Sequence, residues 1–511
     1  MEILNTDFEN NSCAVRGLSE AKLNDLQTCQ RASKNTNWYK IPTLIIFAIG
    51  LFVCLGGCNR SEKSPLLDYN DTAEKTFPVY YDRINDVADY VLACQIPQGG
   101  LCRNISERNN RSGKECFMTT YCFGGTALVK AFQMTGKKEY LDGARKFIDF
   151  WMMYQNKEPD RFGVVGTFYD KYLDSNTSEI KNHYYSVTES VSNKGGPGYD
   201  ASDADGPTIA WTVWEYYKLT GDKKLLEQYC DNFKLILKSM EATLDSNDWL
   251  TRCHPQWPFK YLMDVCEVWA FLGSLENIFT ELQEHELALY CGQWQDNIRQ
   301  TINKKWWNAK DSWYYWYEDN GGNFNKSLDW NKWYPDAAEQ IWPMLWGVTS
   351  AEQAETKLVW KQFNQNIPDW PRTGVEWPMA GNCAAMMGDF EKAIQLNKNI
   401  LNEKLNAEDF QTNQCYFVIL NCCIDFELTG SLYMVKDSFV ADNNNVKFNF
   451  ATIPNGGGEI IFRINNPDKT TILINGLRQM FKSVNGKCII PVKMNAGQII
   501  SCELIYEKDV K

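Results

Sequence analysis

The chain has 511 residues, a formal net charge of −12 and 44% apolar residues. Its length suits one large helical body with an appended domain. The acidic balance and the lack of a basic tract argue against nucleic acid and anionic lipid surfaces as partners. The three histidines, His183, His254 and His285, form no zinc-binding spacing with the cysteines, so we expect neither a metal nor a cofactor.

The longest apolar run covers residues 41–58, which is short for a membrane-spanning helix of roughly 20 residues. It ends in Leu55-Gly56-Gly57-Cys58, which resembles a bacterial lipobox, where the cysteine is lipidated. We interpret residues 1–58 as a lipoprotein signal peptide and membrane-targeting segment, Cys58 as the lipidation site and residues 59–74 as a linker. The long lead before the apolar run leaves a single-pass, signal-anchored membrane protein as the alternative. Both interpretations place the rest of the chain in the cell envelope, outside the cytoplasm.

Between residues 75 and 430, compact helices that are apolar nearly all round alternate with amphipathic helices. Thr135-Gly136-Lys137 after one compact helix matches Thr220-Gly221-Asp222 after the next, and glycine at this position ends a helix. A helix without a polar face must be buried on every side. Six such hairpins predict a mainly α fold, an (α/α)6 toroid with an inner and an outer ring. We expect inner helices near residues 120–135, 210–220, 264–280, 335–348, 376–388 and 411–427, and outer helices near 80–95, 137–154, 222–240, 284–305, 351–366 and 389–404.

The connections between these helices are unequal in length. Two long loops, residues 157–204 and 306–334, are rich in Gly, Asn, Tyr and Trp, and we expect them to form pocket walls. Four cysteines in a loop-rich region allow a disulfide, but the sequence leaves its pairing open: Cys94, Cys102, Cys116 and Cys122.

After residue 430 the pattern changes from helical to extended. Apolar and polar residues alternate between turn signals such as Asn475-Gly476. We predict a small β-sandwich-like domain over residues 431–511. It has no cluster of catalytic residue types, so we expect its role to be structural.

Acidic residues stand where the predicted inner helices begin, and this layout resembles the six-hairpin glycosidase superfamily of (α/α)6 toroids. Asp205-Gly206-Pro207 resembles the Asp-Gly-Pro segment of glucoamylase-type members, whose aspartate binds the released sugar. Asp264-Val265-Cys266-Glu267 resembles their Asp-x-x-Glu segment, whose glutamate is the general acid. The resemblance implies that Asp205 is a sugar ligand and Glu267 the proton donor. No segment matches the catalytic base of that family.

Hydrolysis of a glycosidic bond usually takes two carboxyl groups, one of them protonated. Apolar neighbours and Asp264, one helical turn earlier, would raise the pKa of Glu267. For the base we prefer Glu376, at the start of the fifth inner helix, and then Asp336, at the start of the fourth. The competing interpretation is that first-turn acids serve only the helix dipole.

Taken together, the sequence predicts a cell-envelope lipoprotein that hydrolyses a glycosidic bond of an oligo- or polysaccharide by an inverting mechanism. Glu267 and Glu376 are the expected catalytic residues. Substrate is expected to bind to the hydroxyl-binding acids Asp203, Asp205, Asp264 and Asp336, and to stack on Trp257, Tyr334 and Trp377. The alternatives are an unsaturated uronyl hydrolase, an epimerase or a lyase on the same fold, and a glycan-binding lipoprotein without catalysis.

Overall fold

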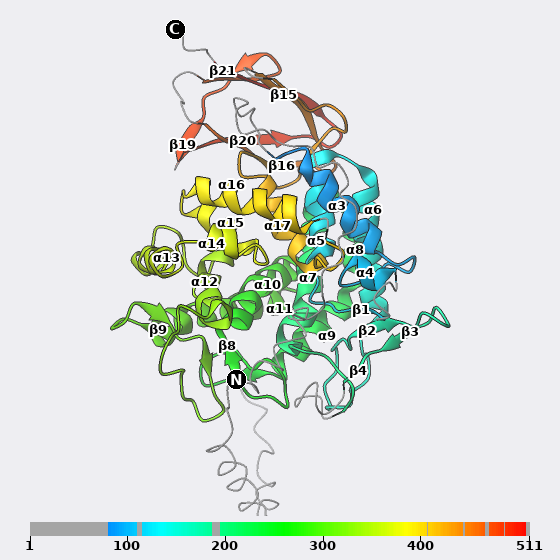
Figure 1. The fold of residues 1–511 in the computed structure, drawn as a ribbon. Coiled ribbons are helices and arrows are strands. Elements are labelled where there is room, and N and C mark those ends of the chain that lie inside the picture. Colours follow the sequence, from blue (N-terminus) through cyan, green and yellow to red (C-terminus); the bar gives the residue numbers. More distant parts are fainter. Residues whose placement is uncertain are drawn as a thin grey trace, which may run out of the picture.

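The computed structural model describes residues 80–109, 115–185, 195–405, 407–442, 445–464, 470–484 and 486–506. The predicted targeting segment with Cys58 and the predicted linker lie outside these residues. In the described part of the chain, no helix is long and apolar enough to cross a membrane. Figure 1 shows a helical body with β-sheets packed against one end.

Six inner helices form a closed ring in the described residues. Each contacts the next in chain order, and the last contacts the first. They are α5 (Gly124–Thr135), α7 (Ser202–Thr220), α10 (Leu262–Glu281), α12 (Trp342–Leu345), α15 (Met379–Met386) and α17 (Cys415–Cys422). The body is therefore an (α/α)6-like toroid, as the helical repeat predicted.

Outer helices surround this ring (Figure 1). They are α3 (Arg83–Cys94), α6 (Lys138–Tyr154), α8 (Lys223–Gln228), α9 (Cys230–Glu241), α11 (His285–Thr301), α13 (Ala354–Asn366) and α16 (Phe390–Asn399). All of them but α13 pack closely against an inner helix. The single outer helix expected after residue 221 is broken at Tyr229 into α8 and α9. Short helical segments lie between the hairpins: α4 (Ile105–Arg108), α14 (Trp370–Thr373), η2 (Ile302–Trp306), η3 (Trp333–Ala337), η4 (Ile400–Lys404) and η5 (Thr412–Gln414).

Glycine ends the first two inner helices, as predicted. Gly136 after α5 has φ 69° and Gly221 after α7 has φ 62°, a left-handed conformation that glycine adopts without steric cost. The fourth and fifth inner helices are shorter than expected. Pro343 at the start of α12 and Pro378 before α15 lack the backbone N–H that a longer helix needs.

The axis of the ring is filled with aromatic side chains. Their ring centroids lie 5.0 to 6.0 Å apart. They form the axial aromatic cluster: Phe123, Trp211, Phe271, Trp346, Tyr416 and Phe417. Such aromatic contacts bury large apolar surfaces, so the toroid has a packed core here rather than a channel.

Short strands line the long loops at the N-terminal ends of the inner helices. They are β1 (Cys116–Met118), β2 (Lys171–Leu173), β3 (Ile180–Asn182), β4 (Tyr184–Tyr185), β5 (Gly196–Pro197), β6 (Leu244–Asp245), β7 (Leu250–Thr251), β8 (Lys260–Tyr261), β9 (Trp307–Asn308), β10 (Trp313–Tyr314) and β11 (Tyr317–Glu318). β1, β2 and β3 form one antiparallel sheet, and β8 pairs with β11 immediately before α10.

The C-terminal strands form two antiparallel sheets. One has the order β12-β16-β20-β19 and the other β13-β15-β21-β17-β18, with β14 beside β15. Phenylalanine rings from both sheets meet, with Phe426 and Phe448 4.8 Å apart. The strands are β12 (Phe426–Leu428), β13 (Leu432–Met434), β14 (Val440–Ala441), β15 (Asn445–Thr452), β16 (Gly456–Arg463), β17 (Thr470–Ile474), β18 (Leu477–Arg478), β19 (Lys482–Val484), β20 (Lys487–Met494) and β21 (Ile499–Tyr506).

The sheets contact the C-terminal end of α5. The buried ammonium of Lys130 on α5 donates to Glu427 Oε1 at 2.8 Å and to the Leu428 carbonyl at 2.9 Å. The N-terminal ends of the inner helices therefore remain free to form a site at the other end of the ring.

Candidate active site

Buried acids gather where α7 and α10 begin, and these two helices pack against each other. Asp203 and Asp205 lie in the first turn of α7, and Asp264 and Glu267 lie in the first turns of α10. All four side chains are buried. The structure thus brings together four of the predicted site residues.

Glu267 lies between side chains from opposite parts of the ring. Its Oε1 accepts a hydrogen bond from Tyr121 Oη at 2.6 Å and another from Trp342 Nε1 at 3.0 Å. Its Oε2 is buried and has no hydrogen-bond partner among the described residues. Burial raises the pKa of Glu267 to about 8, against the opposing effect of these two hydrogen bonds. Since Oε1 only accepts, we place the proton of the neutral acid on Oε2.

A fifth buried acid, Glu339, was not predicted. Its Oε2 accepts a hydrogen bond from the backbone N–H of Met263 at 3.2 Å, in the first turn of α10. A carboxylate at this place satisfies a donor that the helix itself leaves unpaired. Glu339 therefore fixes the start of the helix that carries Asp264 and Glu267.

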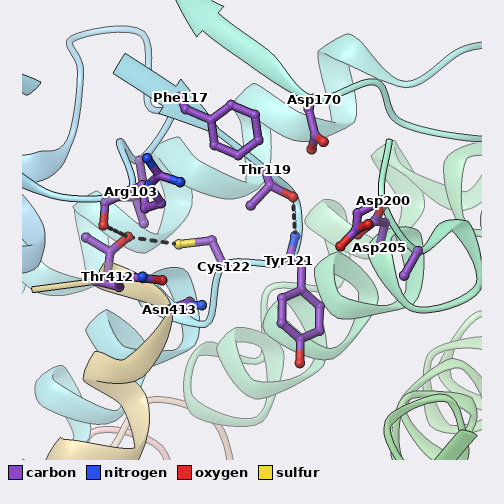
Figure 2. A pocket seen from close by; sticks show the side chains of 13 residues that line it. Arg103, Phe117, Thr119, Tyr121, Cys122, Asp170, Asp200, Asp205, Thr412 and Asn413 are labelled. Carbon is purple, nitrogen blue, oxygen red and sulfur yellow. Dashed lines mark hydrogen bonds between the residues drawn. The ribbon is translucent and has the colours of Figure 1, made fainter. Parts of the chain in front are cut away.

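A pocket opens beside these acids (Figure 2). Its cavity measures about 30 Å³, and its mouth is open to solvent. Three aspartates line it, together with Phe117 and Tyr121 as aromatic walls. The full lining is Leu101, Arg103, Phe117, Thr119, Tyr121, Cys122, Asp170, Asp200, Ala201, Asp205, Gln411, Thr412 and Asn413.

Asp205 is the most exceptional of the three pocket aspartates. Both of its carboxyl oxygens are buried, and neither has a hydrogen-bond partner in the described ranges. Burial and the neighbouring Asp170, Asp200 and Asp203 raise its pKa well above the usual value. A buried polar group without a partner is rare in native proteins, so Asp205 requires an explanation such as a bound water, an ion, a ligand or a catalytic role.

The other two pocket aspartates also hold protons tightly. Burial raises the pKa of Asp170 to about 7, although Tyr185 donates a hydrogen bond to it. Burial and then the charge of Asp170 raise the pKa of half-buried Asp200 to about 7. At neutral pH the pocket therefore contains protonated and ionised carboxyls side by side, which is the arrangement that acid–base chemistry requires.

Asp203 and Asp264 lie behind the pocket wall rather than in it. Asp203 Oδ2 accepts a hydrogen bond from Thr251 Oγ1 at 2.7 Å, and burial raises the pKa of Asp203 to about 7. Burial also raises the pKa of Asp264 well above its usual value, and Asp203 and Glu267 add to this. Neither carboxyl lines the described pocket.

Glu376, the predicted base, does not join the acids. Its side chain is 61% exposed and pairs with Lys404 at 3.3 Å. Trp377, the next residue, takes the inward direction and packs against Trp342 at 5.8 Å. The structure therefore corrects the prediction, because Pro378 starts the helix later than expected and leaves Glu376 on the outer surface.

Asp336 is buried but already has two partners. Lys332 lies 3.2 Å from its Oδ2, and the backbone N–H of Asp329 donates to Oδ1 at 3.0 Å. These contacts hold the loop before α12. Asp336 does not line the described pocket, and its role as a substrate-binding residue stays a prediction.

The predicted stacking residues lie near the acids but outside the pocket lining. Tyr334 stacks on Trp377 with ring centroids 5.0 Å apart. Trp257 stacks on Phe259 at 4.8 Å and donates from Nε1 to Tyr261 Oη at 3.1 Å. Their faces are at least partly occupied by other rings, so no contact in the structure assigns them to a sugar.

Among the described residues, no group of three or more His, Cys, Asp or Glu side chains could hold a metal ion. Of the four cysteines that allowed a disulfide, Cys102 and Cys116 form one, and Cys94 and Cys122 remain free and buried. Each disulfide cysteine directly precedes a pocket residue, Arg103 or Phe117.

Comparison with protein-family models found no match, and neither did comparison with curated proteins. Among solved structures, the chain is similar to α-L-rhamnosidase from Dictyoglumus thermophilum, with 12% identity over 83% of this chain and 49% of that chain and a TM-score of 0.49. It is also similar to GH63 mannosylglycerate hydrolase from Thermus thermophilus, with 10% identity over 66% of this chain and 98% of that chain and a TM-score of 0.43. A D-mannose isomerase matches with 11% identity over 69% of this chain and 98% of that chain and a TM-score of 0.43.

These similarities concern the fold alone. The chain spans about half the length of the rhamnosidase, and the matched proteins include both hydrolases and an isomerase. The predicted six-hairpin architecture rests on the closed ring of helices in the described residues. The resemblance to glucoamylase-type members is not shown by these solved structures.

Proposed function

We propose that this chain is a glycoside hydrolase whose chemistry is carried out by the pocket aspartates. The observation that carries the proposal is Asp205, whose two buried oxygens lack partners in the described structure and line one pocket with Asp170 and Asp200. Phe117 and Tyr121 add apolar faces of the kind that pack on sugar rings. Such a combination of acids and rings suits a saccharide with several hydroxyl groups.

The two catalytic roles follow from the different surroundings of two carboxyls. Asp205 is buried and holds its proton, so it donates that proton to the leaving oxygen. Asp200 is half-buried with a pKa raised to about 7, so it is ionised in part of the population and serves as the second carboxyl. Glu267 lies behind Tyr121, to which it is hydrogen-bonded, and we propose that it positions this pocket residue.

Replacing Asp200 by asparagine should lower kcat/KM by about 100-fold or more, because the second catalytic carboxyl is lost. The matched control is Glu376→Gln, which changes an exposed acid and should leave turnover unchanged. Both proteins would be assayed on a panel of aryl glycosides and oligosaccharides. Full activity of Asp200→Asn, or an equal loss in Glu376→Gln, would contradict these roles. Tight glycan binding without any product would favour the non-catalytic glycan-binding alternative.

Replacing Glu267 by glutamine separates a positioning role from proton donation. Because the neutral acid and the amide have nearly the same shape, and both keep an oxygen facing Tyr121, we expect kcat to change by less than about 10-fold. A proton donor would instead lose about 100-fold or more. The pH profile of the Tyr121→Phe variant gives a second readout. This variant loses the hydrogen bond to Glu267, so its kcat should change. The part of the pH–rate profile that reports the ionisation of Asp200 should remain.

A second candidate is hydration of an unsaturated uronide. It is favoured because Asp200 and Asp205 lie together on one side of the pocket, whereas inversion needs carboxyls on opposite faces of the sugar (Figure 2). In this reaction one aspartate protonates the enol ether and its neighbour activates the water. Loss of ultraviolet absorbance from an unsaturated disaccharide would identify it. Release of a saturated sugar from an intact glycoside would identify the hydrolase.

We also propose that the protein acts in the cell envelope, with Cys58 as a lipid anchor. The Cys102–Cys116 disulfide supports this location, because such bonds persist in oxidising compartments. Metabolic labelling with a fatty-acid analogue would test it, with a Cys58→Ser variant as the unlabelled control.

A further inference from the structure

The wall opposite the aspartates carries a cation. Arg103 lines the same pocket as Asp200 and Asp205, and Figure 2 shows it on the other side, beside Thr412 and Asn413. Its side chain is 25% exposed. The pocket is therefore polarised, with acids on one wall and a guanidinium with amide side chains on the other.

Arg103 is held more firmly than a surface arginine. Its backbone N–H donates to the Phe117 carbonyl at 2.9 Å, and its carbonyl accepts from the Thr412 N–H at 2.8 Å. The Cys102–Cys116 disulfide joins the residues directly before Arg103 and Phe117. The guanidinium carbon lies 5.7 Å from the centroid of the Phe117 ring. The Arg103 side chain is therefore largely ordered in the free protein, so little of its conformational entropy is lost when a ligand binds.

Glu107 orients the guanidinium without using all of it. This buried acid accepts from Arg103 Nε at 3.0 Å and from the Nη2 amino group with the same oxygen, Oε1. Its other oxygen accepts from the Phe117 N–H at 3.3 Å. A guanidinium has five N–H donors, and Glu107 takes two of them. The other donors have no partner in the described part of the chain.

We infer that Arg103 recognises an anionic group on the sugar, so that the substrate is an acidic saccharide carrying a carboxylate or a sulfate ester. This inference rests on the proposed function of the pocket and names its substrate class. The planar fork of the guanidinium matches both anionic groups, whereas a neutral hydroxyl would use only one donor. At neutral pH Asp205 keeps its proton and does not repel such a ligand, and Asp170 and Asp200 are ionised only in part.

Asn413 adds a polar group on the same wall. Its Oδ1 is buried and has no hydrogen-bond partner among the described residues. It lies beside Arg103 in the pocket lining, so a sugar hydroxyl next to the anionic group can donate to it. The wall thus offers donors for the anion and an acceptor for its neighbouring hydroxyl.

Binding rather than turnover tests this inference. The probes are matched pairs of glucuronic, galacturonic and O-sulfated oligosaccharides with their neutral counterparts, titrated calorimetrically into Asp205→Asn protein. We expect at least one acidic probe to bind about 10- to 100-fold more tightly than its neutral counterpart. The carboxylate and sulfate arms of the panel distinguish the two anionic groups.

The variant that removes the cation must not leave Glu107 buried without a partner. Arg103→Gln is therefore combined with Glu107→Gln, and this double variant should lose the acidic preference while keeping the thermal midpoint within a few degrees. Arg103→Lys keeps the charge but loses the fork, so it should retain only part of the preference.

The outcomes separate this inference from the proposed function. Equal binding of acidic and neutral probes, or an unchanged preference in the double variant, would overturn the role of Arg103. Hydrolysis of a neutral glycoside by the wild-type protein would still support the proposed function in that case. Acidic preference without any turnover would support Arg103 and count against hydrolysis.

Discussion

Asparagine in place of Asp205 is expected to abolish turnover and, in the same protein, to raise the thermal midpoint of unfolding. The loss in kcat/KM should be about 100-fold or more, because the proposed proton donor is removed. The gain in stability follows from burial, since both oxygens of this carboxyl lack partners in the described residues. Removing an unpaired buried acid should add about 1 kcal/mol or more to the free energy of unfolding.

The gain should depend on pH in a defined direction. The folded-state pKa of Asp205 lies well above its ordinary value, so the folded protein keeps a proton that the unfolded chain releases. Below about pH 4 the carboxyl is neutral in both states and asparagine brings little change. As pH rises from there through the folded-state pKa, the wild-type protein loses stability and the variant does not. The difference in thermal midpoint should therefore grow between about pH 5 and pH 8.

Thermal unfolding of both proteins across this pH range measures the effect. The control is Asp231→Asn, which changes an exposed acid in the first turn of the outer helix α9 and should alter the midpoint by less than about 1 °C. If the thermal midpoint fell in Asp205→Asn, or rose equally at all pH values, the buried carboxyl would not be the source of the difference in stability.

The sequence predicted the ring because its signals are local. Helix periodicity and the glycines at 136 and 221 are read within a few residues, and the structure has left-handed caps at both. Buried acids at the start of α7 and α10 were predicted for the same reason. The Asp205 and Glu267 segments each carry their own pattern, and the pKa of Glu267 is raised by burial as expected.

The features that the sequence did not predict depend on which way a side chain points and on contacts between residues far apart in the chain. Whether Glu376 or Trp377 points inward is decided by how the segment before Pro378 packs, and no local pattern encodes this. Asp170 enters the pocket through the β1–β2–β3 sheet, from a loop predicted only as a wall. Glu339 acts on a helix more than 70 residues away in sequence, and Arg103 becomes a pocket residue only through its contacts with Phe117 and Thr412.

A buried lysine directly before helix α10 gives the largest expected effect on stability. Lys260 is 4% exposed in β8, directly before α10. Its ammonium lies 2.7 Å from Asp248, 3.0 Å from Asp245 and 3.2 Å from Glu318. It thereby joins β8 to β11 and to the loop before β7, which fixes the entry of the chain into α10.

Lys260→Met should therefore lower the free energy of unfolding by about 3–5 kcal/mol at neutral pH, because three neighbouring carboxylates lose their shared cation. Burial opposes ionisation of Asp245, yet the hydrogen bonds from Lys260 and the Asn247 N–H and the charges of Lys260 and Arg252 together outweigh it and lower the pKa of this acid to about 2. The stabilisation is thus present above the ordinary aspartate pKa and is lost as pH falls towards 2, so the variant should approach wild-type stability in acid.

The control variant Lys234→Met breaks the half-exposed ion pair with Glu284 and should lower the free energy of unfolding by less than about 1 kcal/mol. Adding Asp248→Asn to Lys260→Met should recover part of the loss, and urea titrations of the four proteins would measure it. If the double variant were no more stable than Lys260→Met, lost packing of the lysine stem would be the cause instead of uncompensated charge.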